Sequence, residues 1–361
     1  MTADALVIGA GPAGLAFAIA AAGRGLSVTV LEARRPPLDK ACGEGLLPGA
    51  VRALAALGIA GRLPPEETAP IREIRWIDGP RAAALKLPPP FGLGVRRTAL
   101  SAALLARAGE VGVEVRTGAA VRAHRREPDG VVAETDAGEV RGRVLVAADG
   151  LASPVRRREG LDVPAAAPAG GRFGVRRHLA RPPWADAVEV HFGAGAEAYV
   201  TPAGTDRVGV AFLVDGPPAK FEELLGRFPA LAGRLSGARP TSAPRGAGPL
   251  ERSARARVAD RLVLLGDAAG YVDAVTGDGI ALAFGCALDL AALLPAALAR
   301  GATRKALAPY EAAWRRRFRP YQAWTRLVLA LAARPALRAR VLALVAAAPA
   351  PFERAVRAAV G

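Results

Sequence analysis

The segment Gly9-Ala-Gly-Pro-Ala-Gly14 limits what this chain can fold into more than any other part of the sequence. An apolar stretch at 4–8 precedes it and predicts a buried strand, while small residues at 12–23, opened by Pro12, predict a helix. A second strand is expected at 27–31. A strand, a helix and a strand within about 30 residues are typical of a parallel sheet whose glycine turn holds a pyrophosphate.

Each position of this unit has an expected task. Gly9 permits the tight turn, Gly11 lets the backbone approach the pyrophosphate, and Gly14 lets the helix pack closely on the strand. Glu32 ends the second strand, where a carboxylate accepts a hydrogen bond from a ribose 2′-hydroxyl. The motif alone fits NAD or FAD. A glycine-rich turn without a ligand, and a plain surface carboxylate, are the alternatives.

Two later strands are also expected to deliver an aspartate to the ligand edge of the sheet. Residues 144–156 read Val-Leu-Val-Ala-Ala-Asp-Gly-Leu-Ala-Ser-Pro-Val-Arg, and residues 262–270 read Leu-Val-Leu-Leu-Gly-Asp-Ala-Ala-Gly. Ligands bind beyond the carboxyl ends of strands in open α/β sheets, so we expect Asp149 and Asp267 near the same ligand. A turn or helix-cap role is the alternative for both.

Together with Thr276-Gly-Asp-Gly-Ile280, these segments resemble the flavoprotein monooxygenases of the para-hydroxybenzoate hydroxylase fold. Within that group the chain looks most like the branch of geranylgeranyl reductases and flavin-dependent halogenases. The resemblance covers roughly residues 1–300 and implies FAD as the cofactor, with NADH or NADPH as a transient reductant. It places Asp149 near the flavin, Asp267 on the ribityl chain, and the 276–280 helix start at the pyrimidine edge, where it stabilises reduced flavin.

The motifs and the resemblance together name a set of candidate cofactor-binding residues. These are Gly9, Gly11, Pro12, Ala13, Gly14, Glu32, Ala33, Arg34, Cys42, Gly43, Arg97, Val121, Asp149, Gly150, Gly266, Asp267, Gly277, Gly279 and Ile280.

The stretch Lys40-Ala-Cys-Gly-Glu-Gly-Leu-Leu-Pro48 resembles the Cys-Gly-Gly segment of the geranylgeranyl reductase branch, which lies over the flavin. Cys42 and Glu44 are therefore the candidate catalytic residues. Cys42 as an inert packed thiol is the alternative. Residues 198–210 echo the strands that line the substrate pocket in that branch, but they lack the halogenase tryptophans, which disfavours halogenation.

The expected fold class is α/β with an inserted α+β part. The resemblance implies a Rossmann-like FAD-binding domain of glutathione reductase type 2, made of 1–70, 95–168 and 255–300. A mostly antiparallel substrate-binding sheet is expected from 71–94, read as a hairpin, and 169–254. Residues 301–361 form a C-terminal helical segment, and helix is expected from 279 almost to 360.

The predicted function is that of an FAD-dependent oxidoreductase with a small-molecule substrate. The first reading is an NAD(P)H-dependent monooxygenase that hydroxylates or epoxidises through a flavin C4a-hydroperoxide. The alternative is a reductase of prenyl or activated C=C bonds. A third reading is a membrane-surface or carrier-protein binding module with a structural flavin, because the helix around 311–326 carries aromatics beside Arg315, Arg316, Arg317 and Arg319.

Composition narrows the remaining classes. The net charge of +16 comes mainly from arginines spread along an alanine-rich chain, so no nucleic-acid partner is expected, whereas peripheral membrane or carrier-protein contact stays open. Cys42 and Cys286 form no disulfide framework, which favours the cytoplasm, and the N-terminus is expected to be a strand rather than a signal peptide. No stretch is expected to approach the roughly 18–20 uninterrupted apolar residues of a membrane-spanning helix. The nearest is 327–348, which Arg334, Pro335, Arg338 and Arg340 interrupt. The scattered histidines predict no metal site, and the oligomeric state is left open.

Overall fold

A computed structural model of the chain describes residues 2–163, 171–193, 195–216 and 219–350. The glycine turn lies in an eight-stranded sheet, referred to below as the first sheet, whose strands run in the order β20-β21-β11-β1-β2-β8 with the hairpin β9–β10 attached to β11. Its central strands β21, β11, β1, β2 and β8 are parallel. The bounds are β1 (Ala3–Ile8), β2 (Val28–Glu32), β8 (Glu114–Thr117), β9 (Val121–Arg126), β10 (Val131–Thr135), β11 (Gly138–Ala147), β20 (Val258–Ala259) and β21 (Leu262–Leu264).

A second eight-stranded sheet has the order β17-β13-β16-β15-β14-β5-β6, with β18 attached to β13. Its central strands β13 to β16 are antiparallel, and β5 joins β14 in parallel, so the early hairpin β5–β6 extends a sheet built from later residues. The bounds are β5 (Glu73–Asp78), β6 (Arg81–Lys86), β13 (Arg172–Ala180), β14 (Ala187–Gly193), β15 (Ala196–Pro202), β16 (Val208–Asp215), β17 (Arg239–Pro240) and β18 (Arg245–Ala247).

Two small sheets connect these large ones. The strands β3 (Gly45–Leu46), β7 (Gly92–Val95) and β4 (Thr68–Ile71) form one, and β12 (Asp162–Val163) pairs with β19 (Ser253–Ala254) in the other. The helices are α1 (Pro12–Ala22), α2 (Pro48–Ala56), α3 (Arg97–Glu110), α4 (Pro154–Arg158), α5 (Phe221–Gly226), α6 (Pro229–Arg234), α7 (Gly279–Ala299), α8 (Arg304–Ala332) and α9 (Pro335–Ala347).

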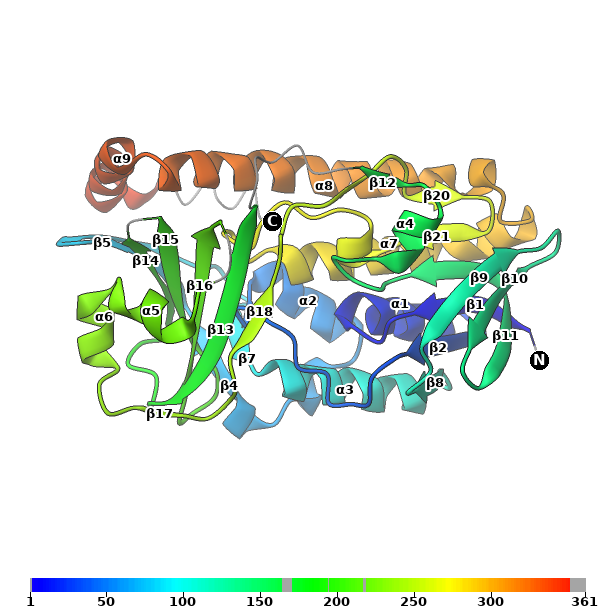
Figure 1. Cartoon of the computed structure of the whole chain (residues 1–361), viewed down its shortest axis with the longest axis horizontal. Coiled ribbons are helices and arrows are strands. Elements are labelled where there is room, and N and C mark those ends of the chain that lie inside the picture. Colours follow the sequence, from blue (N-terminus) through cyan, green and yellow to red (C-terminus); the bar gives the residue numbers. More distant parts are fainter. Residues whose placement is uncertain (1, 164–170, 194, 217–218, 351–361) are drawn as a thin grey trace.

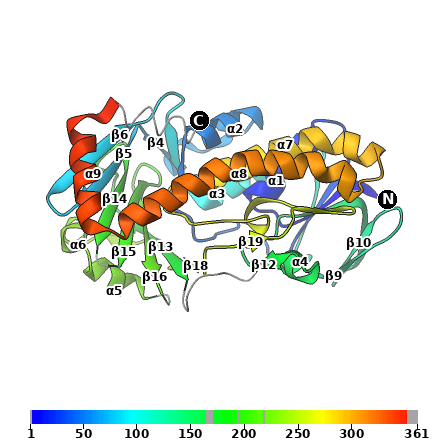
Figure 2. The ribbon, with the colours of Figure 1, turned by 90° about the horizontal axis from the view of Figure 1, so that it is seen from above.

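The two large sheets lie at opposite ends of an elongated molecule (Figure 1). The main core is formed by the first sheet with α1, α3 and α7, and a second core lies between β13–β16 and the short helices α5 and α6. Helix α8 runs along the top of the molecule from the first sheet to the second, where α9 packs against β6 (Figures 1 and 2). The long helix therefore ties the two ends together.

Helix α7 corrects one sequence expectation. The longest apolar helix is α7, not the stretch at 327–348, and among the described residues it alone is long and apolar enough to cross a membrane. In this fold α7 packs against α1 and α8, and its side chains Phe284, Cys286 and Leu290 are almost fully buried. Core helices of globular proteins have the same composition.

The α/β fold class is confirmed. The strands expected at 4–8 and 27–31 are present with small shifts of their ends, as Ala3–Ile8 and Val28–Glu32. The continuous helix expected after 279 divides into three helices at Arg300–Thr303 and Ala333–Arg334. The part of that expectation at 351–360 lies outside the described residues.

Candidate cofactor and substrate site

The glycine turn between β1 and α1 is held together by close packing. A Cβ atom on Gly9, which has φ +105°, would lie 2.4 Å from the carbonyl oxygen of Ala148 on the neighbouring strand end. A Cβ on Gly14 would lie 2.1 Å from the carbonyl oxygen of Gly9. By contrast, a Cβ on Gly11 would meet nothing within 4 Å, and Gly11 lines a cavity. The outer glycines therefore permit the turn, and the middle one opens it to a ligand.

Glu32 fixes the same turn from the second strand. Its Oε2 accepts a hydrogen bond from the backbone N–H of Ala10 at 2.9 Å, and its Oε1 accepts one from the N–H of Arg34 at 3.0 Å. The side chain is buried, although it does not line the cavity. Each carboxylate oxygen can accept a second bond, so Glu32 keeps acceptor capacity for a hydroxyl group.

The ends of β11 and β21 bring Asp149 and Asp267 to the same edge of the first sheet. Asp149 Oδ2 accepts from the N–H of Val155 at 3.1 Å, while Oδ1 is buried without a partner in the described structure. Burial raises the pKa of Asp149, and it also raises that of Asp267, which lines the cavity. Lys40, Arg97 and Arg156 oppose the shift of Asp267.

The N-terminus of α7 forms another part of the cavity wall. Gly277, Asp278, Gly279 and Ile280 all line it. Asp278 occupies the N-cap position, but its carboxylate makes no capping hydrogen bond and its Oδ1 is buried without a partner in the described residues. Burial raises the pKa of Asp278 to about 7, with Thr276 as the opposing hydrogen-bond partner. The side chain therefore keeps its proton up to a pH well above the pKa that is usual for an aspartate.

Lys40 and Cys42 lie in the loop that crosses the cavity. Burial by the cavity walls lowers the pKa of Lys40. Repulsion from Arg97 and Arg34 lowers this pKa further, by a smaller amount. A Cβ on Gly150 would lie 3.4 Å from Lys40 Nζ, so the ammonium group reaches the opposite wall. Burial raises the pKa of the Cys42 thiol, which keeps it protonated. This favours the packed thiol over a reactive nucleophile.

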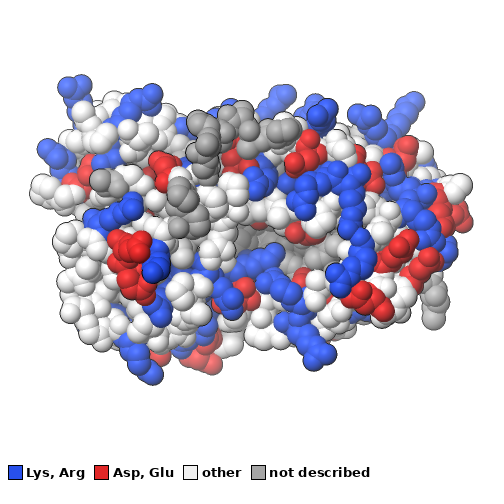
Figure 3. Space-filling model, in the orientation of Figure 1, with Lys and Arg blue, Asp and Glu red and all other residues white. Residues whose placement is uncertain are grey.

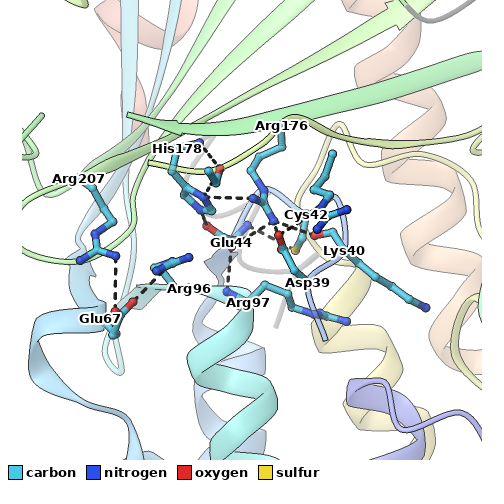
Figure 4. Close-up of polar contacts among 12 residues, drawn as sticks. Asp39, Lys40, Cys42, Glu44, Glu67, Arg96, Arg97, Arg176, His178 and Arg207 are labelled. Atoms are coloured by element: carbon cyan, nitrogen blue, oxygen red, sulfur yellow. Dashed lines mark hydrogen bonds and ion pairs between the residues drawn. The ribbon is translucent and has the colours of Figure 1, made fainter. Parts of the chain in front are cut away.

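Glu44 lies at the centre of a buried polar network (Figure 4). Its Oε1 accepts from the N–H of Arg97 at 2.8 Å, and its Oε2 lies 2.5 Å from His178 Nε2. The guanidinium of Arg176, which is itself paired with Asp39, lies 3.1 Å from His178 Nδ1. A guanidinium can only donate, so Nδ1 accepts and the proton of the neutral ring is on Nε2, from which it is donated to Glu44.

The network changes the role expected for Glu44. Only 2% of the residue is exposed and both carboxylate oxygens have protein partners, so the side chain is not placed to bind substrate. Its backbone has φ +60°, a conformation that glycine adopts freely. Glu44 is therefore a positioning residue that attaches the cofactor loop to β13 of the second sheet through His178, and we correct the catalytic assignment accordingly.

The far end of the cavity is formed by the second sheet and α8. Most of its lining is apolar, with Arg176, Tyr199 and Thr201 as polar side chains from the second sheet. Tyr199 donates its hydroxyl proton to the carbonyl of Val275 at 3.2 Å. An apolar wall of this kind binds an apolar part of a ligand and excludes water. The wall includes Ile74, Trp76, Leu85, Leu87, Val175, Val188, Val190, Ala211, Leu213 and Val328.

The cavity brings together most of the residues named from the sequence. Those that line it are Gly11, Pro12, Ala13, Cys42, Gly43, Glu44, Arg97, Gly150, Gly266, Asp267, Gly277, Gly279 and Ile280. The others, which do not line it, are Gly9, Gly14, Glu32, Ala33, Arg34, Val121 and Asp149. Gly9, Gly14 and Glu32 support the turn from behind, as described above.

Sequence reasoning missed Lys40, Asp278, Arg176 and the role of His178. Lys40 and Asp278 lie inside the motifs given in the sequence analysis. A charged residue beside glycines in such a motif could have indicated a place in the cavity wall. Arg176 and His178 are two apart on β13 and therefore lie on one face of the strand, which alternation could have indicated. None of the three histidines lines the cavity.

The arrangement fits a long cofactor that carries phosphates at one end. Arg97 Nε and Asp278 Oδ1 belong to residues that line the cavity and are buried without a partner in the described part of the chain, as is Oδ1 of Asp149, next to the lining residue Gly150. Buried polar atoms without partners are rare unless a ligand satisfies them. The open turn at Gly11 and the cations Lys40 and Arg97 suit a pyrophosphate beside α1.

Comparisons with known proteins agree with this fit. The sequence pattern of a family described as "FAD binding domain" matches residues 2–205. A menaquinone reductase of Mycobacterium tuberculosis is 36% identical over 166 residues, which cover 44% of this chain and only 40% of that protein. Digeranylgeranylglycerophospholipid reductase 1 of Methanopyrus kandleri is 29% identical over 314 residues, covering 78% of each chain. The p-nitrophenol 4-monooxygenase of Pseudomonas putida has the same fold, with a TM-score of 0.80 at 22% identity over 96% of this chain and 94% of its own.

Proposed function

We propose that this chain, which belongs to the FAD binding domain family and is an FAD-dependent oxidoreductase, reduces a carbon–carbon double bond in a long apolar substrate of the prenyl type. The observation that carries this proposal is the cavity wall beyond the α7 N-terminus, where most lining side chains, among them Ile74, Leu87 and Val190, are apolar and suit an apolar substrate. Two relatives named as reductases, of menaquinone and of a digeranylgeranyl phospholipid, support the same class.

Different residues of the chain would take part in different steps of such a reaction. The bound cofactor would supply the hydride, with NADH or NADPH as the external reductant. Gly277 and Gly279 open the backbone at the start of α7, whose N-terminal N–H groups favour negative charge on the cofactor side of the cavity. Reduction of a double bond also consumes a proton. Asp278 lies in the cavity wall, and burial raises its pKa to about 7, so a large fraction of the molecules carry its proton at neutral pH and we assign it as the proton donor.

The cofactor-binding residues named from the sequence, and the division into an FAD domain and a substrate domain, remain part of this proposal. The lining of one cavity by 12 of these cofactor-binding residues supports the first. The membership of β5 and β6 in the sheet of β13–β16 supports the second. Cytoplasmic location is a further proposal, supported by the unpaired state of Cys42 and Cys286 and testable by cell fractionation.

Oxygen transfer to the same substrate is the second candidate. The apolar wall and the covering helix α8, which contributes Trp324 and Val328 to the cavity, would exclude water as an oxygenating flavoenzyme requires. Both candidates therefore share a binding site and differ in the fate of the reduced cofactor.

Rapid mixing separates the two reactions. The purified FAD-loaded protein is reduced without oxygen and is then mixed with either a prenyl substrate or oxygen. Reoxidation by geranylgeranyl lipid or menaquinone under anaerobic conditions, with a product in which a prenyl double bond is saturated, supports the reductase; formation of a quinol alone does not. A transient absorbance on mixing with oxygen, followed by an oxygenated product, supports the monooxygenase. Protein that takes up no FAD would contradict both.

Contact with a lipid surface is a further part of the proposal. The aromatic face expected from α8 is not available, because Trp314, Phe318 and Tyr321 are buried against the core. Instead, α8 and α9 expose large leucines, of which Leu327 is 51% and Leu344 is 69% exposed. Leucines beside exposed arginines suit the interface of an anionic membrane, while a carrier protein is the alternative. Co-sedimentation with anionic and neutral vesicles would distinguish them.

A further inference from the structure

A groove beside the first half of α8 belongs to neither the cofactor cavity nor the substrate end. It lies between α8 and the segment that links β19 to β20, which run alongside each other in Figure 2. Its volume of about 520 Å³ is that of a small-molecule site. The lining residues are Arg255, Ala256, Val258, Arg304, Ala308, Glu311, Ala312, Arg315, Arg316 and Arg319.

Among the described residues, one carboxylate, that of Glu311, lines this groove, and its charge is already paired. Glu311 accepts hydrogen bonds from the backbone N–H of Arg257 at 2.6 Å and from the Arg257 side chain at 3.5 Å. The Arg315 guanidinium lies 3.1 Å from the same carboxylate. Arg257 is fixed in turn by the Trp314 ring, whose centre is 3.6 Å from its guanidinium carbon. Glu311 therefore has little charge left to offer the groove.

The guanidinium groups of four groove arginines have no acidic partner among residues 2–163, 171–193, 195–216 and 219–350. These are Arg255, Arg304, Arg316 and Arg319, and all four are exposed. The neighbouring Arg317 behaves differently, because it forms a two-bond pair with Asp289. Just as Arg317 lies beside Asp289, basic side chains are interspersed with acidic ones on the face drawn in Figure 3. The groove is thus a local excess of unpaired guanidinium groups.

The floor of the groove consists of short apolar side chains. Ala256, Val258, Ala308 and Ala312 leave room between the arginines. Guanidinium groups present several donors in a plane that matches the oxygens of a phosphate, and they are weakly hydrated. We propose that this groove binds a phosphate or diphosphate group. The group could be carried by a free phosphate compound or by the headgroup of an anionic lipid, and the proposal does not depend on which redox reaction the flavin performs.

The test uses the FAD-loaded full-length protein and a pair of charge-matched double variants. Arg316→Ala with Arg319→Ala removes two groove arginines. Arg52→Ala with Arg227→Ala removes two exposed arginines that lie outside the groove and have no acidic partner in the described residues. Titration calorimetry with inorganic pyrophosphate measures one source of the ligand. Co-sedimentation with phosphatidylglycerol vesicles, against phosphatidylcholine vesicles, measures the other.

The groove variant is expected to bind its ligand at least about tenfold more weakly, because two charge-assisted contacts are lost, whereas the control variant stays near the parent protein. Weakened pyrophosphate binding assigns the groove to free phosphate compounds, and weakened vesicle binding alone assigns it to lipid headgroups. The proposal is overturned if the parent protein binds neither probe, or if both variants lose affinity equally. The flavin absorbance of each variant reports folding independently of the result.

Discussion

The carboxylate of Glu44 and the imidazole of His178 face each other at 2.5 Å in a fully buried contact, although 134 positions separate them in the chain. Glu44 belongs to the loop over the cofactor cavity and His178 to β13 of the second sheet. This contact therefore joins the cofactor side of the molecule to the substrate side, and its loss should affect both.

Replacing Glu44 by alanine should leave the His178 N–H and the backbone N–H of Arg97 buried without acceptors. The expected result is a loss of about 2–4 kcal/mol in the free energy of unfolding, together with weaker FAD binding. Urea denaturation and titration of the apoprotein with FAD measure the two effects. Glu44→Gly is the informative companion, because it removes the same carboxylate but suits φ +60°, so it should destabilise the protein less. Equal stability of all three proteins would show that the network has no positioning role.

Two similar glycine-to-alanine substitutions in the turn should have different effects, one on stability and one on FAD binding. In Gly14→Ala the new Cβ would lie 2.1 Å from the Gly9 carbonyl oxygen, so the turn must open and the apoprotein should lose stability. In Gly11→Ala the Cβ has open space, so the apoprotein should keep its stability while FAD binds more weakly. Thermal unfolding without cofactor, followed by FAD titration, distinguishes the two. Loss of apoprotein stability in Gly11→Ala would contradict this assignment.

Asp278 should make the stability of the apoprotein depend on pH. Its pKa rises from 3.8 to about 7 on folding, so the folded state binds the proton more tightly than the unfolded state. The contribution of Asp278 to the free energy of unfolding is therefore complete below about pH 4 and is lost as the pH rises through about 7. A shift of this size corresponds to at most roughly 4 kcal/mol. Asp278→Asn should remove this part of the slope and be more stable than the parent protein at pH 8. The difference between the two curves isolates Asp278 from Asp149 and Asp267, whose pKa values burial also raises.

The same variant tests the assignment of Asp278 as proton donor. Infrared spectroscopy of the parent protein should show the carbonyl band of a protonated carboxyl group that disappears in Asp278→Asn and titrates near pH 7. Double-bond reduction by the variant should slow by about 10²–10⁴-fold, the range for loss of a general acid, while hydride transfer from NAD(P)H to the flavin is unchanged. A variant that keeps the full rate of double-bond reduction would remove Asp278 from the mechanism.

Cys42 should be a poor nucleophile despite its place in the cavity wall. Burial raises the pKa of its thiol, and burial raises that of Cys286 to about 12. Iodoacetamide at pH 7.5 should therefore label the native protein far more slowly than the unfolded one, because the thiolate is the reacting species. Cys42→Ser should keep FAD binding and most of the activity. Rapid labelling of Cys42 in the native state would restore the reactive-thiol hypothesis.

The sequence by itself determined the nucleotide half of this protein. Gly9, Gly11 and Gly14 act through backbone geometry within one short turn, and such local constraints are visible in the order of residues. The same holds for Asp149 and Asp267, since both follow buried strands whose ends must meet at one edge of the sheet. The fold class and the binding of a dinucleotide followed from these local patterns, whereas the choice of FAD over NAD followed from the resemblance to a flavoprotein family.

Only the tertiary structure decided what Glu44, Asp278 and the aromatic residues of α8 do. Glu44 could have faced the substrate, but His178 and Arg176 arrive from a distant strand and occupy its oxygens. The pKa of Asp278 depends on burial by side chains far away in the sequence. Trp314 and Phe318 could have formed an exposed face, but they pack on the core. Burial, partners and protonation arise from contacts between distant segments, and spacing along the chain does not encode these contacts locally.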